Sequence, residues 1–206
     1  MAALPPMTSS DFAAALNVSR ETLAKLEVYE AMLRQWQNTI NLISSSTLHD
    51  VWRRHFFDSG QLCPLLLNAE TIVDIGSGGG FPGLVVAIMT DAPVYLVESD
   101  NRKATFLREV SRATSANAKI LAGRAESLYP QPAAAVTVRA LAPLPKLLSL
   151  VEPWVQPGGI CYFLKGSTFE EELTDAKKIW DISYDLVPSR SDPSGTILRV
   201  KEFRRV

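Results

Sequence analysis

DIGSGGGFPG, residues 74–83, is the stretch of this sequence that decides the fold. It follows an apolar run at 71–75 that is typical of a buried strand, and it leads into a helical pattern at about 82–90 that opens with Pro82. A glycine-rich turn between a buried strand and a helix lets the backbone approach a ligand at the carboxyl edge of a parallel sheet. The stretch therefore predicts an α/β fold with a ligand site at that edge.

The spacing of the glycines narrows the class of ligand. A dinucleotide fingerprint needs glycine at the first, third and sixth positions, but the sixth position counted from Gly76 is Phe81. No Gly-Lys-Ser/Thr follows the turn, which excludes a P-loop. Glycine at the first, third and fifth positions, completed by Gly78 and Gly80, resembles the first motif of S-adenosylmethionine-dependent methyltransferases. We expect the turn, including Ser77, to contact that cofactor.

Two further segments extend the predicted cofactor site. Glu98 ends a second strand at 94–97, where a carboxylate can accept hydrogen bonds from both ribose hydroxyls. Ala125 and Glu126 follow a third strand at 118–122, at the place that normally holds the adenine in such methyltransferases. Alone, Glu98 could be a solvated strand-end charge and the later pair an exposed helix start. Together with the glycine turn they predict one continuous cofactor site.

The rest of the chain divides into a helical part and an α/β part. Residues 9–67 look wholly helical, with a long amphipathic stretch at 19–42 that Ser19 caps and a second helix that ends near Gly60. From residue 71 onward, β-rich runs alternate with helical patterns. We predict strands at 71–75, 94–97, 118–122, 134–138, 159–164, 182–187 and 196–200, and helices at 82–90, 101–115, 143–154 and 168–180.

These elements predict a Rossmann-like S-adenosylmethionine-dependent methyltransferase fold. Its sheet would have seven mostly parallel strands and a closing antiparallel hairpin. We expect a single domain over 1–206, with an N-terminal helical extension at 1–67 and a cofactor-binding core at 68–206.

Composition limits the function classes. The 206 residues are 47% hydrophobic and 21% charged, with a net charge of −1, so any RNA contact must come from a local basic face. No apolar run reaches the roughly 20 residues that a membrane span needs, and no basic head at 1–10 indicates a secretion signal. Cys63 and Cys161 look like core thiols of a cytoplasmic protein, and with only His49 and His55 beside them we predict no metal site.

A resemblance to one family covers nearly the whole chain. The matching segments are Asn41-Leu42, Arg54-His55 with Asp58-Ser59, Gly76-Ser77-Gly78 with Gly80-Phe81-Pro82-Gly83, Asn101-Arg102-Lys103, Phe106-Leu107, Arg124-Ala125-Glu126, Arg139-Ala140 and Lys165-Gly166. In this order they resemble the bacterial 16S rRNA guanine-N7 methyltransferase family, the RsmG or glucose-inhibited division protein B type. The Gly-Phe-Pro-Gly ending and the His-x-x-Asp-Ser motif are far more specific than the glycines alone.

The resemblance implies methyl transfer to N7 of one guanine in the decoding-region loop of 16S rRNA. Residue by residue, it implies cofactor contacts from Gly76, Phe81, Ala125, Glu126 and Arg139. Two positions depart from the family pattern: Ala134 and Val138 stand where an acidic residue and a serine are usual, which removes their polar contacts from the fourth strand. Glu98 stands where aspartate is common, and its longer side chain should still reach the ribose.

The expected chemistry needs no general base. Guanine N7 has an exposed lone pair and no proton to remove, so catalysis would rest on proximity and orientation. The segment 138–143 lacks the Asp/Asn-Pro-Pro-aromatic element of exocyclic amine methyltransferases, and neither cysteine is placed to act as a nucleophile. We expect Arg139, Lys165 and His55 to position the substrate. His55 and Asp58 share a helix face and could either anchor the extension or line the pocket.

Five basic residues are candidates for phosphate contacts: Arg53, Arg54, Arg102, Lys103 and Lys165. A solvated helix face is an equal alternative for the 101–112 run. The acidic run 170–172 predicts an exposed first helical turn, and we expect a monomer. Two other functions stay open, a non-catalytic S-adenosylmethionine-binding regulator and a small-molecule methyltransferase.

Overall fold

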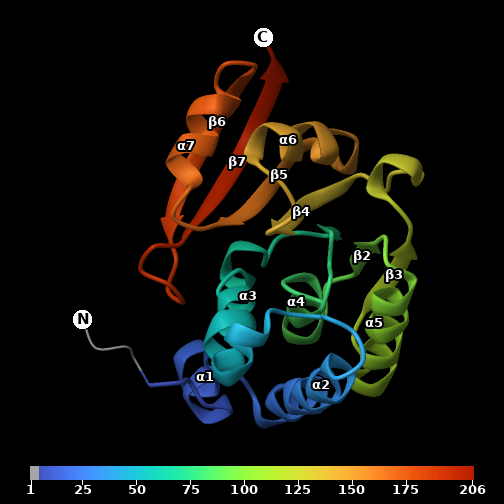
Figure 1. Ribbon diagram of the computed structural model, residues 1–206. Coiled ribbons are helices and arrows are strands. Elements are labelled where there is room, and N and C mark those ends of the chain that lie inside the picture. The colour runs from blue at the N-terminus through green and yellow to red at the C-terminus, as the bar shows by residue number, and fades with distance from the viewer. Residues whose placement is uncertain (1–4) are drawn as a thin grey trace.

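Residues 5–206 are described by a computed structural model, in which a seven-stranded sheet runs through the molecule (Figure 1). Residues 1–4 fall within the stretch for which the sequence predicts no secretion signal, and they lie outside the described residues. The strands follow the order β3-β2-β1-β4-β5-β7-β6. Their bounds are β1 Ile72–Ile75, β2 Val94–Glu98, β3 Ala118–Ala122, β4 Ala133–Arg139, β5 Val155–Lys165, β6 Trp180–Pro188 and β7 Thr196–Arg205.

The pairing confirms the predicted fold class. Strands β1 to β5 pair in parallel, and β7 runs antiparallel to both β5 and β6. All seven predicted strands are present. β5 and β7 are longer than predicted. β5 begins at Val155, before an irregularity in its pairing with β4 that includes Gly158 at a φ of +77°, and β7 continues through the charged residues 201–205.

Helices cover both faces of the sheet and create two hydrophobic cores. Ile72 of β1 belongs to one core and its neighbour Val73 to the other, as strand alternation requires. The first core includes residues of α1 (Ser9–Leu16), α2 (Arg20–Gln37), α4 (Gly83–Thr90) and α5 (Asn101–Thr114). The second includes residues of α6 (Leu144–Val151) and α7 (Phe169–Ala176).

The extension is helical but less regular than predicted. Ser19 caps α2 by accepting from the Thr22 N–H at 3.1 Å, as expected. The predicted helix at 19–42 ends at Gln37, because the Gln37 side chain binds the backbone of Leu42 and Ile43 and closes a turn. The predicted second helix is split into a 3-10 turn η1 (Ser45–Asp50), a π-helix η2 (Trp52–Phe57), α3 (Asp58–Gly60) and a 3-10 turn η3 (Cys63–Leu65).

Other boundaries also differ from the prediction. Pro82 is the residue before α4 rather than its first residue, and the peptide bond between Phe81 and Pro82 is cis. The predicted helix at 143–154 is α6 followed by the 3-10 turn η5 (Glu152–Trp154), and a short turn η4 (Ala125–Ser127) follows β3. The predicted helix at 168–180 ends at Ala176; Trp180 instead begins β6, where its buried ring packs edge-on against Phe203 at 5.6 Å.

An aromatic cluster joins the extension to the glycine turn. The Tyr29 ring of α2 stacks on Phe81 with centroids 5.3 Å apart and meets Phe56 edge-on at 5.1 Å. Trp52 is buried, and the half-buried Trp36 packs on Phe106, in agreement with their predicted core role. Because Phe81 belongs to the glycine turn, the extension holds that turn in place.

Both cysteines lie in the core, as the sequence predicted. Cys63 and Cys161 are both free and buried, and burial raises the pKa of the Cys63 thiol to about 12. In the part of the chain that is described, no helix combines the length and the apolar character needed to cross a membrane.

Candidate active site

A cleft of about 640 Å³ opens at the carboxyl edge of the sheet, beside the glycine turn. Its walls come from the turn, from the segment 42–44, from η2 and α3, and from the connection between β6 and β7. A second cavity of about 240 Å³ shares Gly76, Ser99 and Leu141 with the cleft and reaches Ala125 and Glu126. The two spaces form one elongated site along the sheet edge. The volume of the cleft suits small-molecule binding, and the second cavity extends it.

The backbone of the glycine turn is shaped for close approach. Gly76, Gly78 and Gly80 have φ values of +75°, +56° and +94°, which side-chain-bearing residues rarely adopt. A Cβ at Gly80 would collide with the Tyr29 hydroxyl, whereas at Gly78 the nearest atom is the Gly76 oxygen at 3.8 Å. The Tyr29 hydroxyl also donates to the Gly79 carbonyl. Gly80 is therefore needed for packing, and Gly78 leaves open space within the cleft.

Glu98 reaches across the end of β2 to the glycine turn. It is 6% exposed, and its two carboxylate oxygens accept from the backbone N–H groups of Gly78 and Asp100, each at 2.7 Å. A carboxylate oxygen can accept more than one hydrogen bond, so this arrangement leaves capacity for hydroxyl donors. The Glu98 side chain therefore stabilises the glycine turn through Gly78 and also lines the cleft.

A buried carboxyl lies directly under the turn. Asp74 of β1 is 1% exposed, and its Oδ1 accepts from the Thr137 hydroxyl at 2.8 Å. Burial raises the pKa of Asp74 to about 6, against the hydrogen bond from Thr137. The sequence predicted that Ala134 and Val138 remove polar contacts from the fourth strand. Val138 does pack in the second core, but Thr137 next to it supplies a polar contact from that strand.

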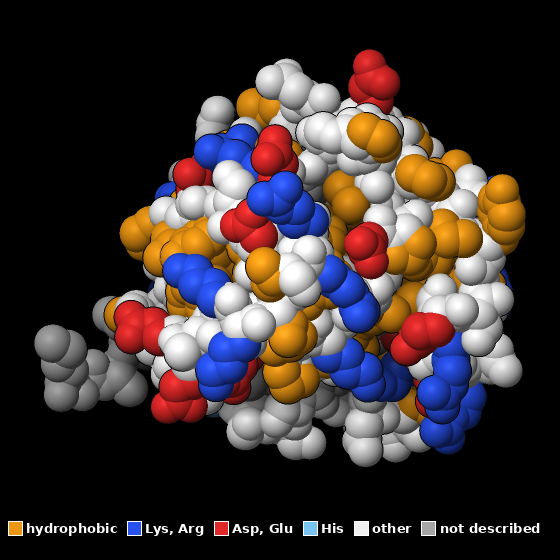
Figure 2. Space-filling model, turned by 90° about the horizontal axis from the view of Figure 1, so that it is seen from above, with side chains coloured by type: hydrophobic (Ala, Val, Ile, Leu, Met, Phe, Trp, Pro, Cys, Tyr) orange, Lys and Arg blue, Asp and Glu red, His pale blue; other side chains and the backbone are white. Residues whose placement is uncertain are grey.

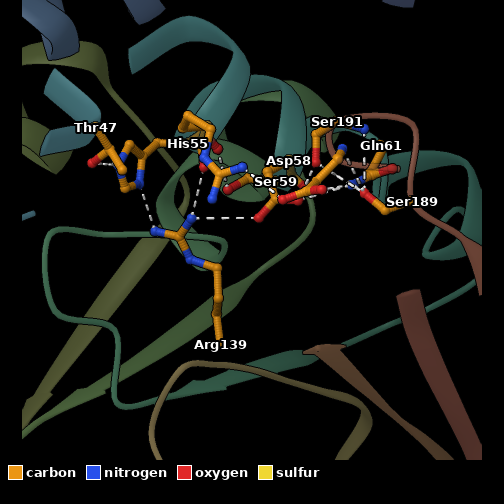
Figure 3. A network of polar contacts seen from close by, with 10 residues as sticks. Thr47, His55, Asp58, Ser59, Gln61, Arg139, Ser189 and Ser191 are labelled. Atoms are coloured by element: carbon orange, nitrogen blue, oxygen red, sulfur yellow. Dashed lines mark hydrogen bonds and ion pairs between the residues drawn. The ribbon is translucent and has the colours of Figure 1, made fainter. Parts of the chain in front are cut away.

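Arg139, at the end of β4, joins the sheet to the extension (Figure 3). Its guanidinium donates to His55 Nδ1 at 2.9 Å, to the Arg54 carbonyl at 3.1 Å and to Asp58 Oδ2 at 3.4 Å. It also lies over the Phe81 ring, 5.2 Å from the centroid. The sequence motif His-x-x-Asp therefore both anchors the extension and lines the cleft, which combines the two roles considered for it.

The hydrogen bonds around His55 define its protonation. Nδ1 accepts from Arg139, so Nε2 carries the hydrogen and donates to the Thr47 hydroxyl at 2.7 Å, which in turn donates to the Ser44 carbonyl at 2.8 Å. Burial, followed by the charges of Arg139 and Arg54, lowers the pKa of His55 to about 3. The imidazole is neutral near pH 7 and is suited to positioning rather than to proton transfer.

The structure separates the basic candidates into two groups. Arg54, Lys103 and Lys165 line the cleft, as Arg139 does, whereas Arg53 and Arg102 do not. Arg53 instead pairs with Asp50 at 3.2 Å and donates to the Pro5 carbonyl, and the Arg102 side chain is 73% exposed near Asp100.

Lys165 is less available than its position at the strand end suggests. Its ammonium pairs with Glu172 at 2.7 Å and donates to the Ala142 carbonyl. The Lys165 side chain is only 8% exposed. Glu172 in turn accepts from the Leu144 N–H. The predicted exposed acidic turn is therefore wrong for Glu172, which is half-buried, although Glu170 and Glu171 are exposed.

Sequence reasoning missed several residues that line the cleft or support its walls. Ser189, Ser191 and Asp192 lie in the connection between β6 and β7, which the sequence indicated only as a turn. Gln61 binds this connection but had no motif around it. Tyr29 could have been found, because it continues the apolar helical spacing from Leu26 to Leu33.

The fold and site define a methyltransferase of the S-adenosylmethionine-dependent class. Two solved structures share this fold. Cofactor-bound Rv0187 from MTB has a TM-score of 0.62 and 14% identity, and the match covers 98% of this chain and 99% of that chain. TYW2 from M. jannaschii in complex with AdoMet has a TM-score of 0.58 and 16% identity, and the match covers 82% of this chain and 80% of that chain. Residues 22–190 match the family model described as rRNA small subunit methyltransferase G, and the chain belongs to this family.

Curated relatives agree with that assignment. The protein named ribosomal RNA small subunit methyltransferase G from Rhodospirillum centenum is 53% identical over 97% of this chain and 93% of its own length. The protein of the same name from Gluconobacter oxydans is 47% identical over 92% of this chain and 98% of its own length. The family resemblance drawn from the motifs is confirmed.

Proposed function

We propose that this chain transfers a methyl group from S-adenosylmethionine to N7 of a guanine in 16S ribosomal RNA. The observation that carries the proposal is the elongated cleft of the glycine turn in a chain of the small-subunit rRNA methyltransferase family. The end of this site near Ala125 and Glu126 suits a nucleoside. The opposite end is lined by basic and polar side chains, which suit a nucleotide substrate.

Backbone and acidic groups along the sheet edge would hold the cofactor, which supplies an electrophilic methyl group when bound. The fit rests on the open space in front of Gly78 and on the left-handed glycines. Glu98 would accept from the ribose hydroxyls, while Ala125 and Glu126 border the smaller cavity, where the adenine would lie. The remaining contacts would come from Gly76, Ser77, Gly78, Phe81 and Arg139, which line the cleft. Gly80, which was also expected to contact the cofactor, does not line the cleft and instead packs against Tyr29.

The residues of the cleft fit a reaction without a general base. His55 is neutral and its two ring nitrogens are both engaged, so it holds Arg139 rather than moving a proton. Asp74 is buried below the turn and does not line the cleft. What remains for the protein is to orient the guanine ring so that its N7 lone pair points at the methyl group.

Recognition of RNA would use a small number of cations at the rim. On the face seen in Figure 2, Lys and Arg side chains are interspersed with Asp and Glu, in keeping with a net charge of −1. Arg54 and Lys103 border the cleft and Arg102 is exposed on the neighbouring helix turn, so these three would contact phosphates. Arg54 also pairs with Asp192, but its side chain is 44% exposed, whereas those of Arg53 and Lys165 are 19% and 8% exposed, so neither of these two would contact RNA. Lys165, which lines the cleft, would serve to support the site.

The chain would act in the cytoplasm, where ribosomal RNA is modified, and as a monomer. The described large apolar side chains that are exposed lie on different elements and form no evident interface. We also propose that 1–206 folds as one domain, because the core that contains α2 and η2 also contains α4 and α5. Light scattering after size exclusion would test the monomer against a mass of 22.6 kDa.

The test of function is methyl transfer to defined RNA. Purified protein is incubated with labelled S-adenosylmethionine and either naked 16S rRNA or small subunits, and 7-methylguanosine is measured by mass spectrometry after nuclease digestion. We expect 7-methylguanosine at a single position with the wild-type chain and none with Gly78→Asp. Cofactor binding without transfer to either RNA, or methylation at another atom, would refute the proposal; the first result would favour a regulator.

A further inference from the structure

Asp58 occupies a junction between three parts of the fold (Figure 3). It follows the π-helix η2, and its N–H bonds the Arg53 carbonyl five residues earlier. Its Oδ2 accepts from Arg139 of β4 at 3.4 Å. Its Oδ1 accepts from the hydroxyl of Ser191 at 2.5 Å and from Gln61 Nε2 at 3.1 Å. One carboxylate therefore contacts the end of β4 and the connection between β6 and β7.

The segment 189–192 of that connection lies beside α3 (Figure 1) and is held to the extension at successive residues. Gln61 Oε1 accepts from the Arg190 N–H at 2.8 Å, and the Arg190 guanidinium lies 5.2 Å from the centre of the Phe57 ring. Asp192 pairs with Arg54 at 2.7 Å. These contacts join residues about 130 positions apart, so the segment owes its position to the extension.

Two of the partners of Asp58, Arg139 and Ser191, line the same cleft. Arg139 lies against Phe81 of the glycine turn, while Ser191 lines the cleft from the connection between β6 and β7, next to Asp192. The side chains of Asp58 and Arg139 are 19% and 18% exposed, so their attraction is only partly screened by water. Movement of Asp58 would therefore shift Arg139 and the segment 189–192 together.

We propose that Asp58 is a positioning residue for methyl transfer, which ties the cofactor side of the cleft to the RNA side. It fixes Arg139 beside the glycine turn and fixes the segment 189–192 where RNA enters. This inference rests on the proposed function, because it assigns the 189–192 wall to the RNA substrate. It predicts that loss of the carboxylate weakens binding of both substrates, whereas loss of Ser191 weakens only binding of RNA.

Asp58→Asn and Ser191→Ala separate the two contacts. In Asp58→Asn the amide oxygen can still accept from Ser191, but the amide NH2 then faces the Arg139 donors and the contact with Arg139 is lost. If the side chain turns instead, both contacts weaken. We expect the Kd for S-adenosylmethionine, measured by calorimetry without RNA, and the KM for small subunits each to rise about tenfold, with partial recovery in Asp58→Glu. Ser191→Ala should raise the KM for small subunits by a similar factor and leave the Kd within about twofold.

Asp50→Asn is the matched control for loss of stability. Asp50 is another carboxylate of the extension, paired with Arg53, and it does not line the cleft. We expect it to lower the melting temperature while leaving both affinities unchanged. Hydrogen exchange of the amides at 189–195 should rise in Asp58→Asn and Ser191→Ala, and should not rise in Asp50→Asn.

The outcomes decide the inference. It is overturned if Asp58→Asn changes only the melting temperature, as the control does, if it changes one affinity alone, or if Ser191→Ala weakens cofactor binding as strongly as Asp58→Asn. If the wild-type chain methylates no RNA, the proposed function fails. Calorimetry and hydrogen exchange would then still show whether Asp58 holds Arg139 and the segment 189–192.

Discussion

Replacing Asp74 with asparagine should change how the stability of this protein depends on pH. Asp74 is 1% exposed beneath the glycine turn, and burial raises its pKa from 3.8 to about 6. The folded state thus binds a proton more tightly than the unfolded state. The stability from this group is fully present below pH 3.8 and is lost as pH rises through 6. Asparagine has nearly the same shape, remains neutral and can still accept from Thr137.

The size of the effect follows from the shift in pKa. A difference of about two pH units corresponds to about 3 kcal/mol, since each unit is equivalent to about 1.4 kcal/mol. Between pH 4 and pH 8, the free energy of unfolding of the wild type should therefore fall by up to about 3 kcal/mol relative to Asp74→Asn. The comparison uses the change with pH, so a constant offset caused by the new amide does not affect it.

Urea unfolding of both chains at intervals from pH 4 to pH 8 measures this difference. Other titrating groups, including His55, are present in both chains and cancel. Asp181→Asn serves as a control for the exchange of a carboxylate for an amide, because Asp181 is 58% exposed beside Arg204, away from the glycine turn. Parallel curves for wild type and Asp74→Asn would refute the claim that burial of this carboxyl opposes its ionisation.

Three further substitutions test the site. Gly78→Asp should weaken S-adenosylmethionine binding by at least tenfold in calorimetry, because it puts a carboxylate into the cleft beside Glu98; near-normal affinity would mean that the cofactor binds elsewhere. Tyr29→Phe should lower the free energy of unfolding in urea by about 1–3 kcal/mol, because the Gly79 carbonyl loses its buried donor, and no loss would show that this hydrogen bond is dispensable. Arg102→Ala should reduce the salt dependence of RNA binding by roughly one phosphate contact, and an unchanged slope would indicate a solvated helix face.

Much of the fold was predictable because its signals are local. The third strand was predicted at its observed bounds, and the second strand and the helix after it differ by one residue. Errors came where a side chain contact overrode the pattern, as at Gln37, which closes a turn and ends α2 early. Trp180 was misplaced because helical spacing continued past the point where the ring packs into the sheet.

The candidate site was predictable in part. The glycine turn, Glu98 and Arg139 do border one cleft, as the strand ends implied. The state of each charged group was not predictable. Lys165 looked like a free cation at a strand end, but Glu172 approaches it from α7 and neutralises it. Spacing along the chain places a residue at an edge, but it does not show which other element approaches that residue.

The sequence by itself determined the α/β class, the order of the strands along the chain and the ligand-binding edge, because backbone preferences, strand alternation and glycine spacing act over a few residues. Only the tertiary structure decided that Asp58 meets Arg139, 81 positions away, and Ser191, 133 positions away. It also decided that His55 is neutral, because that depends on burial and on two neighbouring guanidinium groups. Such contacts form between distant segments, and packing of the complete chain selects them.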